Sequence, residues 1–462
     1  MAAWAVEKKR PKGRITGVAT NSVARGRPAS SAIWLVPALC GFAVGFDGYD
    51  LIVYGTVLPA LLQYEAWGLT APELGVIGSY VIIGMLFGAL LAGTVTDIIG
   101  RRKTLLICVT WFSVFTTLCG IAPSPELFGL FRFLAGFGLG GLIPVATALT
   151  LEYAPGHRRN ITYTIMMACY NVGGLLAAGL AILLIPAFGW QIMFLIALIP
   201  LVVLVPLGLM YLPESISYLV AQDRRDEAET LSRRFGVPLQ EIAKTVEKEE
   251  ETAVRGGKLH GLKTIVSRLY FLRSVAFWVA SFFGLMLIYG LSTWLPTVMT
   301  EAGYSVGSAL SFLVLFNAGA VVGLLVAGRL ADRLGAKLIC GVFFSIAAMG
   351  LVLLSVKMPL VLNYLFAGVA GAGVFAAMTL VYSYIGQYYP ASSRATALGW
   401  AAGIGRTGAI VGPIVGGLLV GAGLAVPWGF YTFALAGVIA ALIIFLLPKS
   451  PVHAELEKAE WM

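Results

Sequence analysis

Two aspartates that lie three residues apart are the first groups in this sequence that could do chemistry. Asp47 and Asp50 stand in the stretch Gly-Phe-Asp-Gly-Tyr-Asp, within a long apolar run. Residues three apart share one face of a helix, so both carboxylates are expected on the same side. Two carboxylates in a medium of low dielectric constant hold a proton more tightly than in water, which makes them a candidate proton site. The alternative is a structural pair satisfied by backbone or hydroxyl donors.

A single arginine in the middle of another apolar run is a candidate for binding an anion. Arg406 lies about 11 residues into a run that begins near residue 395, at a rise of about 1.5 Å per residue. Its depth is therefore comparable with that of Asp47. A guanidinium can hold a carboxylate through two parallel hydrogen bonds, and so could anchor an anionic substrate. The alternative is a salt bridge to one of the aspartates that only holds the chain together.

Two further charged residues, Arg132 and Glu152, lie near opposite ends of the apolar run around residues 126–150. Either side chain could extend its polar end to the membrane boundary and remain hydrated there. The sequence therefore makes them weaker candidates than the residues above.

An internal repeat relates the two halves of the chain at a single offset of 235 residues. Tyr54-Gly55 matches Tyr289-Gly290, and the matches continue through three further regions. The repeat indicates a duplicated unit, and transporters built in this way bind substrate between the two copies, near the middle of the membrane. Five charged candidates have a different residue type at the equivalent position: Asp47, Asp50, Arg132, Glu152 and Arg406. Their roles are therefore expected to belong to one half only.

Two copies of a charged turn, at residues 93–103 and 328–337, are candidates for a gate. Each combines a glycine, an aspartate and basic residues where a helix ends, so that the acid can pair with a base or cap a neighbouring helix. The candidate gating residues are Asp97, Arg101, Arg102 and Glu152 in the first half, and Asp332, Arg333 and Arg394 in the second.

Membrane-spanning helices must position these residues, because the chain is too apolar for a water-soluble fold. Of 462 residues, 59% are hydrophobic and 12% are charged, against about 25% charged in a typical soluble domain. Apolar runs long enough to cross a hydrocarbon core of about 30 Å lie near residues 33–62, 73–94, 104–121, 126–150, 162–186, 190–211, 274–298, 308–330, 336–356, 361–386, 395–421 and 427–447. The predicted fold class is an all-α membrane protein with twelve transmembrane helices in two six-helix bundles.

The polar segments predict orientation and domain boundaries. Lys and Arg are concentrated before the first run and in alternate loops, which places both termini in the cytoplasm. The net charge of +9 thus follows from membrane orientation and does not indicate nucleic-acid binding. We expect a basic cytoplasmic tail at 1–32, an N-terminal bundle at 33–212, a cytoplasmic connector at 213–272, a C-terminal bundle at 273–448 and a cytoplasmic tail at 449–462.

The turn Gly-Thr-Val-Thr-Asp-Ile-Ile-Gly-Arg-Arg-Lys at residues 93–103, together with Pro213-Glu214-Ser215 after the sixth run, resembles the motifs of the major facilitator superfamily. Ile98 departs from the usual pattern, in which a base follows the acid, although Arg333 supplies that base in the second copy. The resemblance implies the same fold that the hydropathy predicts.

Within that superfamily the sequence is similar to the aromatic acid:proton symporters, which import benzoate, hydroxybenzoates, gentisate or protocatechuate in bacteria. Asp-Gly-Tyr-Asp in the first run, the fourth run, and Tyr-Pro-Ala-Ser-Ser-Arg before the eleventh carry the similarity. It implies transport roles for Asp47, Asp50, Arg132, Glu152, Arg394 and Arg406. Proton coupling is expected at Asp47 and Asp50, and substrate binding at Arg406, Asp47, Asp50 and Arg132 beside the aromatic residues Trp400 and Tyr382.

The predicted function is proton-coupled import of a small aromatic carboxylate by alternating access across a bacterial inner membrane. The expected partners are this substrate, protons and the lipid bilayer, and the chain is expected to work as a monomer. No cofactor, metal or enzymatic activity is expected, because the three histidines fall outside the apolar runs and the five cysteines show no paired spacing. Transport of another small organic anion, or proton-coupled export, stays open because the sequence predicts orientation but not the direction of flux.

Overall fold

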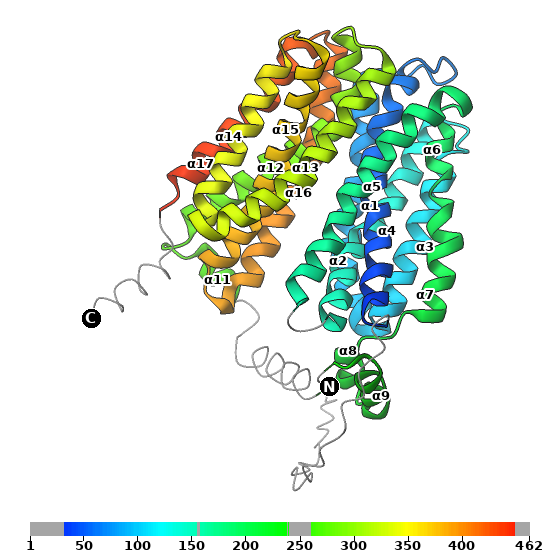
Figure 1. Cartoon of the computed structure of the whole chain (residues 1–462), viewed down its shortest axis with the longest axis vertical. Helices are drawn as coiled ribbons and strands as arrows, with labels where there is room; N and C mark the ends of the chain where they lie inside the picture. Colours follow the sequence, from blue (N-terminus) through cyan, green and yellow to red (C-terminus); the bar gives the residue numbers. More distant parts are fainter. Residues whose placement is uncertain (1–31, 155–157, 238, 240–259, 449–462) are drawn as a thin grey trace, which may run out of the picture.

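The computed structural model describes residues 32–154, 158–237, 239 and 260–448, and in these residues the regular structure is helical (Figure 1). Twelve helical segments are long and apolar enough to cross a membrane, so the prediction of twelve spans in two six-helix bundles is confirmed. The predicted tails at 1–32 and 449–462 lie outside the described residues, except for Ala32.

The N-terminal half contains five long helices and a sixth span that is interrupted. The long helices are α1 (Ala32–Leu62), α2 (Ala71–Ile99), α3 (Arg101–Cys119), α4 (Pro125–Tyr153) and α5 (Arg159–Phe188). The sixth span consists of α6 (Gln191–Leu195), the π-helical turn η2 (Pro200–Leu204) and α7 (Val205–Tyr211). Proline has no backbone N–H and its ring clashes with the preceding turn. Pro200 and Pro206 therefore account for the interruption.

The C-terminal half repeats this arrangement. Its helices are α12 (Phe271–Glu301), α13 (Val306–Leu334), α14 (Ala336–Leu354), α15 (Leu360–Tyr388), α16 (Ala391–Gly421) and α17 (Phe430–Leu446), with a π-helical turn η3 (Ala425–Gly429) before the last. The repeat is also visible in backbone geometry: Gly100 and Gly335, which are equivalent, both have positive φ, at 94° and 91°. This conformation favours glycine and explains the glycine in both charged turns.

Three short helices join the halves at one end of the molecule: α8 (Ile216–Ala221), α9 (Arg225–Phe235) and α11 (His260–Val266) (Figure 1). We call this end, where α1 begins and α17 finishes, the connector end, and the opposite end the distal end. The ring of Phe235 packs edge-on against Tyr153, with centroids 5.0 Å apart, so α9 docks on the N-terminal half. The hydroxyl of Ser274 donates to the carbonyl of Ile265 at 2.8 Å, which attaches α11 to the C-terminal half.

Close contacts between the two halves occur where glycines allow backbones to approach. A Cβ on Gly55 would lie 2.0 Å from the carbonyl oxygen of Ser292, and one on Gly75 would lie 2.7 Å from that of Pro413. These glycines lie on the distal halves of α1 and α2. Towards the connector end the ribbons of the two halves diverge (Figure 1). The halves therefore meet at the distal end.

Candidate functional site

The two aspartates of α1 have different neighbours. The Oδ1 and Oδ2 atoms of Asp50 accept hydrogen bonds from Nη1 of Arg132, on α4, at 3.0 and 2.9 Å. The hydroxyl of Thr116, on α3, donates to Oδ1 at 3.0 Å. Asp50 and Arg132 thus form an ion pair inside the N-terminal half.

Aromatic rings enclose this ion pair. The guanidinium carbon of Arg132 lies 5.2 Å from the ring centre of Tyr54 and 6.0 Å from that of Phe194, within the range of cation–π attraction. The Tyr54 hydroxyl donates to the carbonyl of Leu74 at 2.6 Å, which fixes the ring. Arg132 is 1% exposed, so it does not reach the membrane boundary as its position near a span end suggested. In this conformation the pair is closed to a substrate.

Asp47 lies one turn away and faces the other half of the molecule. Its side chain is 2% exposed, and its Oδ2 atom has no hydrogen-bond partner among the described residues. Arg406, on α16, is near enough to interact with it electrostatically. Asp47 from one half and Arg406 from the other are therefore brought together, as their predicted depths required.

The guanidinium of Arg406 is held by the N-terminal half. Its Nη1 atom donates to the backbone carbonyl of Met85, on α2, at 2.6 Å. Arginine has five N–H donors, and within the described part of the chain this is the one hydrogen bond that the Arg406 guanidinium makes. The alternative of a salt bridge from Arg406 to one of the aspartates is not formed in this conformation, since Asp50 is paired with Arg132 and Arg406 has no ion pair with Asp47 among the described residues.

Three tyrosines surround Asp47 and Arg406. Tyr170 on α5 and Tyr289 on α12 lie within hydrogen-bonding reach of each other, and both interact electrostatically with Asp47. Tyr382 on α15 interacts in the same way with Arg406. All three tyrosines and Arg406 are partly exposed; Tyr170, Tyr289 and Arg406 lie near the middle of their helices, and Tyr382 lies six residues before the end of α15. We call these five residues the central cluster.

Tyr382 is among the binding residues predicted from the sequence, whereas Tyr289 is not. The internal repeat could have identified Tyr289, because it is the equivalent of Tyr54. Each of these two tyrosines lies beside an arginine. Trp400, the other predicted aromatic neighbour, is placed elsewhere: its ring stacks on Trp278 with centroids 5.6 Å apart, and it is 45% exposed. Its role in binding stays a prediction.

The candidate gating residues of the first half form a network at the connector end. Glu152 is paired with Arg101 at 3.0 Å, and its carboxylate also accepts from the hydroxyl of Ser215 at 2.7 Å and from the backbone N–H of Ser217 at 2.6 Å. The N-terminus of α8 is therefore tied to α3 and α4. Asp97 is exposed.

Glu214, of the Pro-Glu-Ser motif, acts on the same turn. Its Oε1 atom accepts from the backbone N–H of Arg102 at 2.9 Å, which satisfies a free donor at the start of α3. The Arg102 guanidinium donates to the carbonyl of Leu209, on α7, at 2.5 Å. In the second half, Asp332, Arg333 and Arg394 are all exposed. The two copies of the charged turn thus differ in their contacts.

Twelve helical spans in two repeated bundles, with opposite charges facing each other between the bundles, define a membrane transporter of the type that binds substrate at a repeat interface. The family model "Major Facilitator Superfamily" matches residues 38–379 and again 313–461. The chain belongs to this superfamily. Its members and the relatives below are transporters, so the chain is a transporter and not an enzyme.

The chain is 36% identical over 419 residues to the benzoate transport protein of Acinetobacter baylyi, covering 90% of this chain and 89% of the relative. It is 38% identical to the gentisate transporter of Corynebacterium glutamicum over 88% of this chain and 85% of the relative. The resemblance to transporters of this type is therefore confirmed. Among solved structures, the xylose transporter XylE from E. coli aligns with a TM-score of 0.73 over 91% of this chain and 98% of that one. At 18% identity this likeness shows the fold alone.

Proposed function

We propose that the protein imports a small aromatic carboxylate together with protons by alternating access. The observation that carries the proposal is the central cluster: Arg406 from one half faces Asp47 from the other, in the middle of the spans, where both halves can close on a ligand. The relatives' names, which specify benzoate and gentisate, supply the substrate class.

Arg406 is the proposed anchor for the substrate carboxylate. One of its donors is fixed on the carbonyl of Met85, and this contact orients the remaining donors. A carboxylate can then be held in two parallel hydrogen bonds. The rings of Tyr170, Tyr289 and Tyr382 supply an aromatic wall for the substrate ring, and their hydroxyls can bond to ring substituents such as a phenol.

Asp47 is the proposed proton carrier. It is buried, and its Oδ2 atom has no partner among the described residues. A substrate carboxylate bound at Arg406 would repel a negative charge on Asp47 in this medium of low dielectric constant. Protonation of Asp47 removes the repulsion, so substrate and proton bind best together. Asp50 is already neutralised by Arg132 and is proposed to support this arrangement structurally.

The proposed location is a bacterial inner membrane, with the connector end in the cytoplasm. The basic residues Arg101, Arg102 and Lys103, with Arg333 and Lys337 in the second half, lie at the helix ends beside Gly100 and Gly335 at that end, as the positive-inside rule expects. The arrangement in Figure 1, in which the halves meet at the distal end, is then the one open towards the cytoplasm. Each chain contains a complete cluster, so a monomer is proposed as the working unit.

Uptake into proteoliposomes tests the proposal. Radiolabelled benzoate, 4-hydroxybenzoate and gentisate should each be tried against the corresponding neutral amides. Uptake should accelerate when the outside is acidic and stop when a protonophore is added, and the amides should not compete. Accumulation that survives the protonophore and requires sodium would refute proton coupling.

A further inference from the structure

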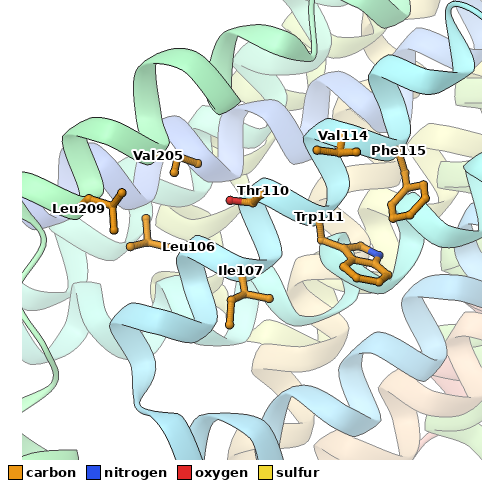
Figure 2. Close-up of a pocket in the computed structure, with 8 residues that line it drawn as sticks. All are labelled: Leu106, Ile107, Thr110, Trp111, Val114, Phe115, Val205 and Leu209. Atoms are coloured by element: carbon orange, nitrogen blue, oxygen red, sulfur yellow. The ribbon is translucent and has the colours of Figure 1, made fainter.

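An apolar groove on the outer surface of the N-terminal half lies apart from the transport site. It has a volume of about 500 Å³ and lies between α3 and the broken sixth span. Figure 2 shows Val205 and Leu209 on one wall and Ile107, Thr110 and Trp111 on the other. Ile107, Trp111 and Leu209 are 50%, 42% and 58% exposed, so the groove opens on the surface that faces the bilayer.

The groove owes its shape to the local sequence. A Cβ on Gly208 would lie 2.5 Å from the side chain of Leu106, so this glycine lets α7 approach α3 closely and forms the contact beneath the groove. On α3 the lining residues run from Leu106 to Phe115, about 13 Å at a rise of about 1.5 Å per residue. This is close to the thickness of one leaflet of a hydrocarbon core of about 30 Å.

Two basic residues lie at the connector end of the groove. Lys103 is exposed and lies four residues before Ile107 and seven before Thr110, so it shares their face of α3. The Arg102 guanidinium, bonded to the carbonyl of Leu209, closes the same end. Beyond Arg102 a second pocket is lined by charges of both signs, with Arg102 and Arg234 beside Glu214, Asp226 and Glu227, and it marks the level where the apolar surface ends.

We propose that this groove binds one acyl chain of an anionic phospholipid from the leaflet at the connector end, with the phosphate beside Lys103. The apolar length of the groove matches the acyl chain of such a lipid, and the cation at its end matches the phosphate. A Lys near an anionic membrane surface contributes about 1 kcal/mol to binding, which is a factor of roughly five in affinity. A free anion would occupy the Lys103 end without filling the groove.

Trp111 provides a signal from inside the groove. Its ring is held against α4, because Nε1 donates to the carbonyl of Leu134 at 2.8 Å. The purified protein would be placed in phosphatidylcholine bilayers that contain a small fraction of phosphatidylglycerol or phosphatidylcholine brominated on the acyl chain. The difference between wild type and Trp111→Phe isolates quenching at this residue.

Brominated phosphatidylglycerol should quench Trp111 at a roughly five-fold lower mole fraction than brominated phosphatidylcholine. Lys103→Gln should abolish that preference, whereas the matched control Lys357→Gln, which removes an exposed lysine at the distal end, should keep it. Thr110→Phe should fill the groove and weaken quenching by both lipids. Equal quenching by the two lipids in wild type, or unchanged quenching in Thr110→Phe, would overturn the proposal.

Native mass spectrometry gives a readout that does not depend on the tryptophan variant. Wild type released from micelles that contain both lipids should keep one phosphatidylglycerol more often than Lys103→Gln does. Equal retention by the two proteins would overturn the proposal, even if Trp111→Phe fails to fold. Binding of inorganic phosphate without either lipid effect would also reject it, since it would show a site for a free anion only.

Discussion

Asp47 and Asp50 are one helical turn apart, but of the two only Asp50 forms an ion pair among the described residues. Asp50 shares its charge with Arg132 and receives a hydrogen bond from Thr116. Asp47 keeps an oxygen atom, Oδ2, that has no hydrogen-bond partner among the described residues. Removing one partner of a buried ion pair costs about 3 to 5 kcal/mol, because the other charge stays buried without compensation. The two positions should therefore respond differently to the same substitution.

We predict that Asp50→Asn lowers the stability of the folded protein, whereas Asp47→Asn leaves it intact and uncouples transport. The Asp50 variant should lose about 3 to 5 kcal/mol, since Arg132 is left unpaired. The Asp47 variant should lose concentrative uptake but still exchange labelled for unlabelled substrate, because exchange does not require release of the proton. Thermal unfolding in detergent and paired uptake and exchange assays measure the two effects.

Each variant is the control for the other. The double variant Asp50→Leu/Arg132→Met, which removes both charges, should recover much of the stability lost by Asp50→Asn. Full proton-driven accumulation by Asp47→Asn would remove Asp47 from the coupling mechanism.

Arg406→Lys should weaken substrate binding at least ten-fold although the charge is kept. Lysine is a point charge without a planar fork, so it cannot hold a carboxylate and the Met85 carbonyl in the same geometry. Arg406→Ala should cost about 3 to 5 kcal/mol of binding free energy. Calorimetric titration with benzoate measures both, and Arg394→Lys is a matched control because Arg394 is exposed at the connector end. Wild-type affinity in Arg406→Ala would identify Arg406 as a structural residue.

One carboxylate, that of Glu152, links three helices at the connector end. Glu152, on α4, bonds to Arg101 at the start of α3 and to Ser215 and Ser217 at the start of α8. The equivalent residue in the second half is Gln387, which is exposed and donates to Ser383 at 3.4 Å. The first half therefore has a fixed attachment for the connector that the second half lacks at this position.

Glu152→Gln should loosen α8. The glutamine amide has one acceptor oxygen where the carboxylate has two, and its N–H₂ group would face hydrogen-bond donors. At least one hydrogen bond is therefore lost, which costs about 1 to 3 kcal/mol of stability. The backbone N–H of Ser217 should then exchange with deuterium roughly ten-fold faster or more. Hydrogen exchange with mass spectrometry measures this, and Gln387→Ala is the matched control. Unchanged exchange at α8 would mean that apolar packing, such as that of Phe235 on Tyr153, holds the connector by itself.

At the scale of the whole molecule, the contact between α2 and α16 at the distal end is set by small residues. A Cβ on Gly417 would lie 2.6 Å from the carbonyl oxygen of Ala71 and 3.2 Å from Cα of Gly75. Side chains added here must push the halves apart at the distal end. In transporters of this architecture one half rocks against the other largely as a rigid body, so opening at one end is expected to accompany closing at the other.

Gly417→Val should therefore shift the population towards an arrangement that is closed at the connector end. Spin labels at Ile98 and Leu334, which are exposed near that end, should approach each other in the variant. Pulsed electron spin resonance measures the distance distribution. Gly307→Val is the matched control, since a Cβ there meets no atom within 4 Å. An unchanged distribution would show that the distal contact does not control the equilibrium.

The spans could be predicted because hydropathy alone requires them. The differences between the predicted runs and the observed helices have local causes. The apolar run near 73–94 corresponds to α2, which continues to Ile99 because the residues after the run, polar ones among them, extend the helix beyond the apolar core. The interruption of the sixth span was not predicted, although Pro200 and Pro206 signal it. The pairing of Asp50 with Arg132, 82 positions apart in the chain, could not be predicted, because it depends on how α1 and α4 rotate against each other.

The burial of Asp47 and Asp50 also has a consequence for how the chain enters the membrane during synthesis. A carboxylate at the centre of a helix disfavours insertion by about 2.5 to 3.5 kcal/mol, and α1 carries two and is less apolar than α2. Its compensating charge, Arg132, is synthesised only 82 residues later. We therefore expect that chains truncated after Ile99 insert α1 less completely than chains truncated after Tyr153. Protease protection of nascent chains measures this insertion. The double variant Asp47→Leu/Asp50→Leu should insert fully at both lengths. Complete insertion of the wild-type chain at the shorter length would show that α1 needs no partner to enter the bilayer.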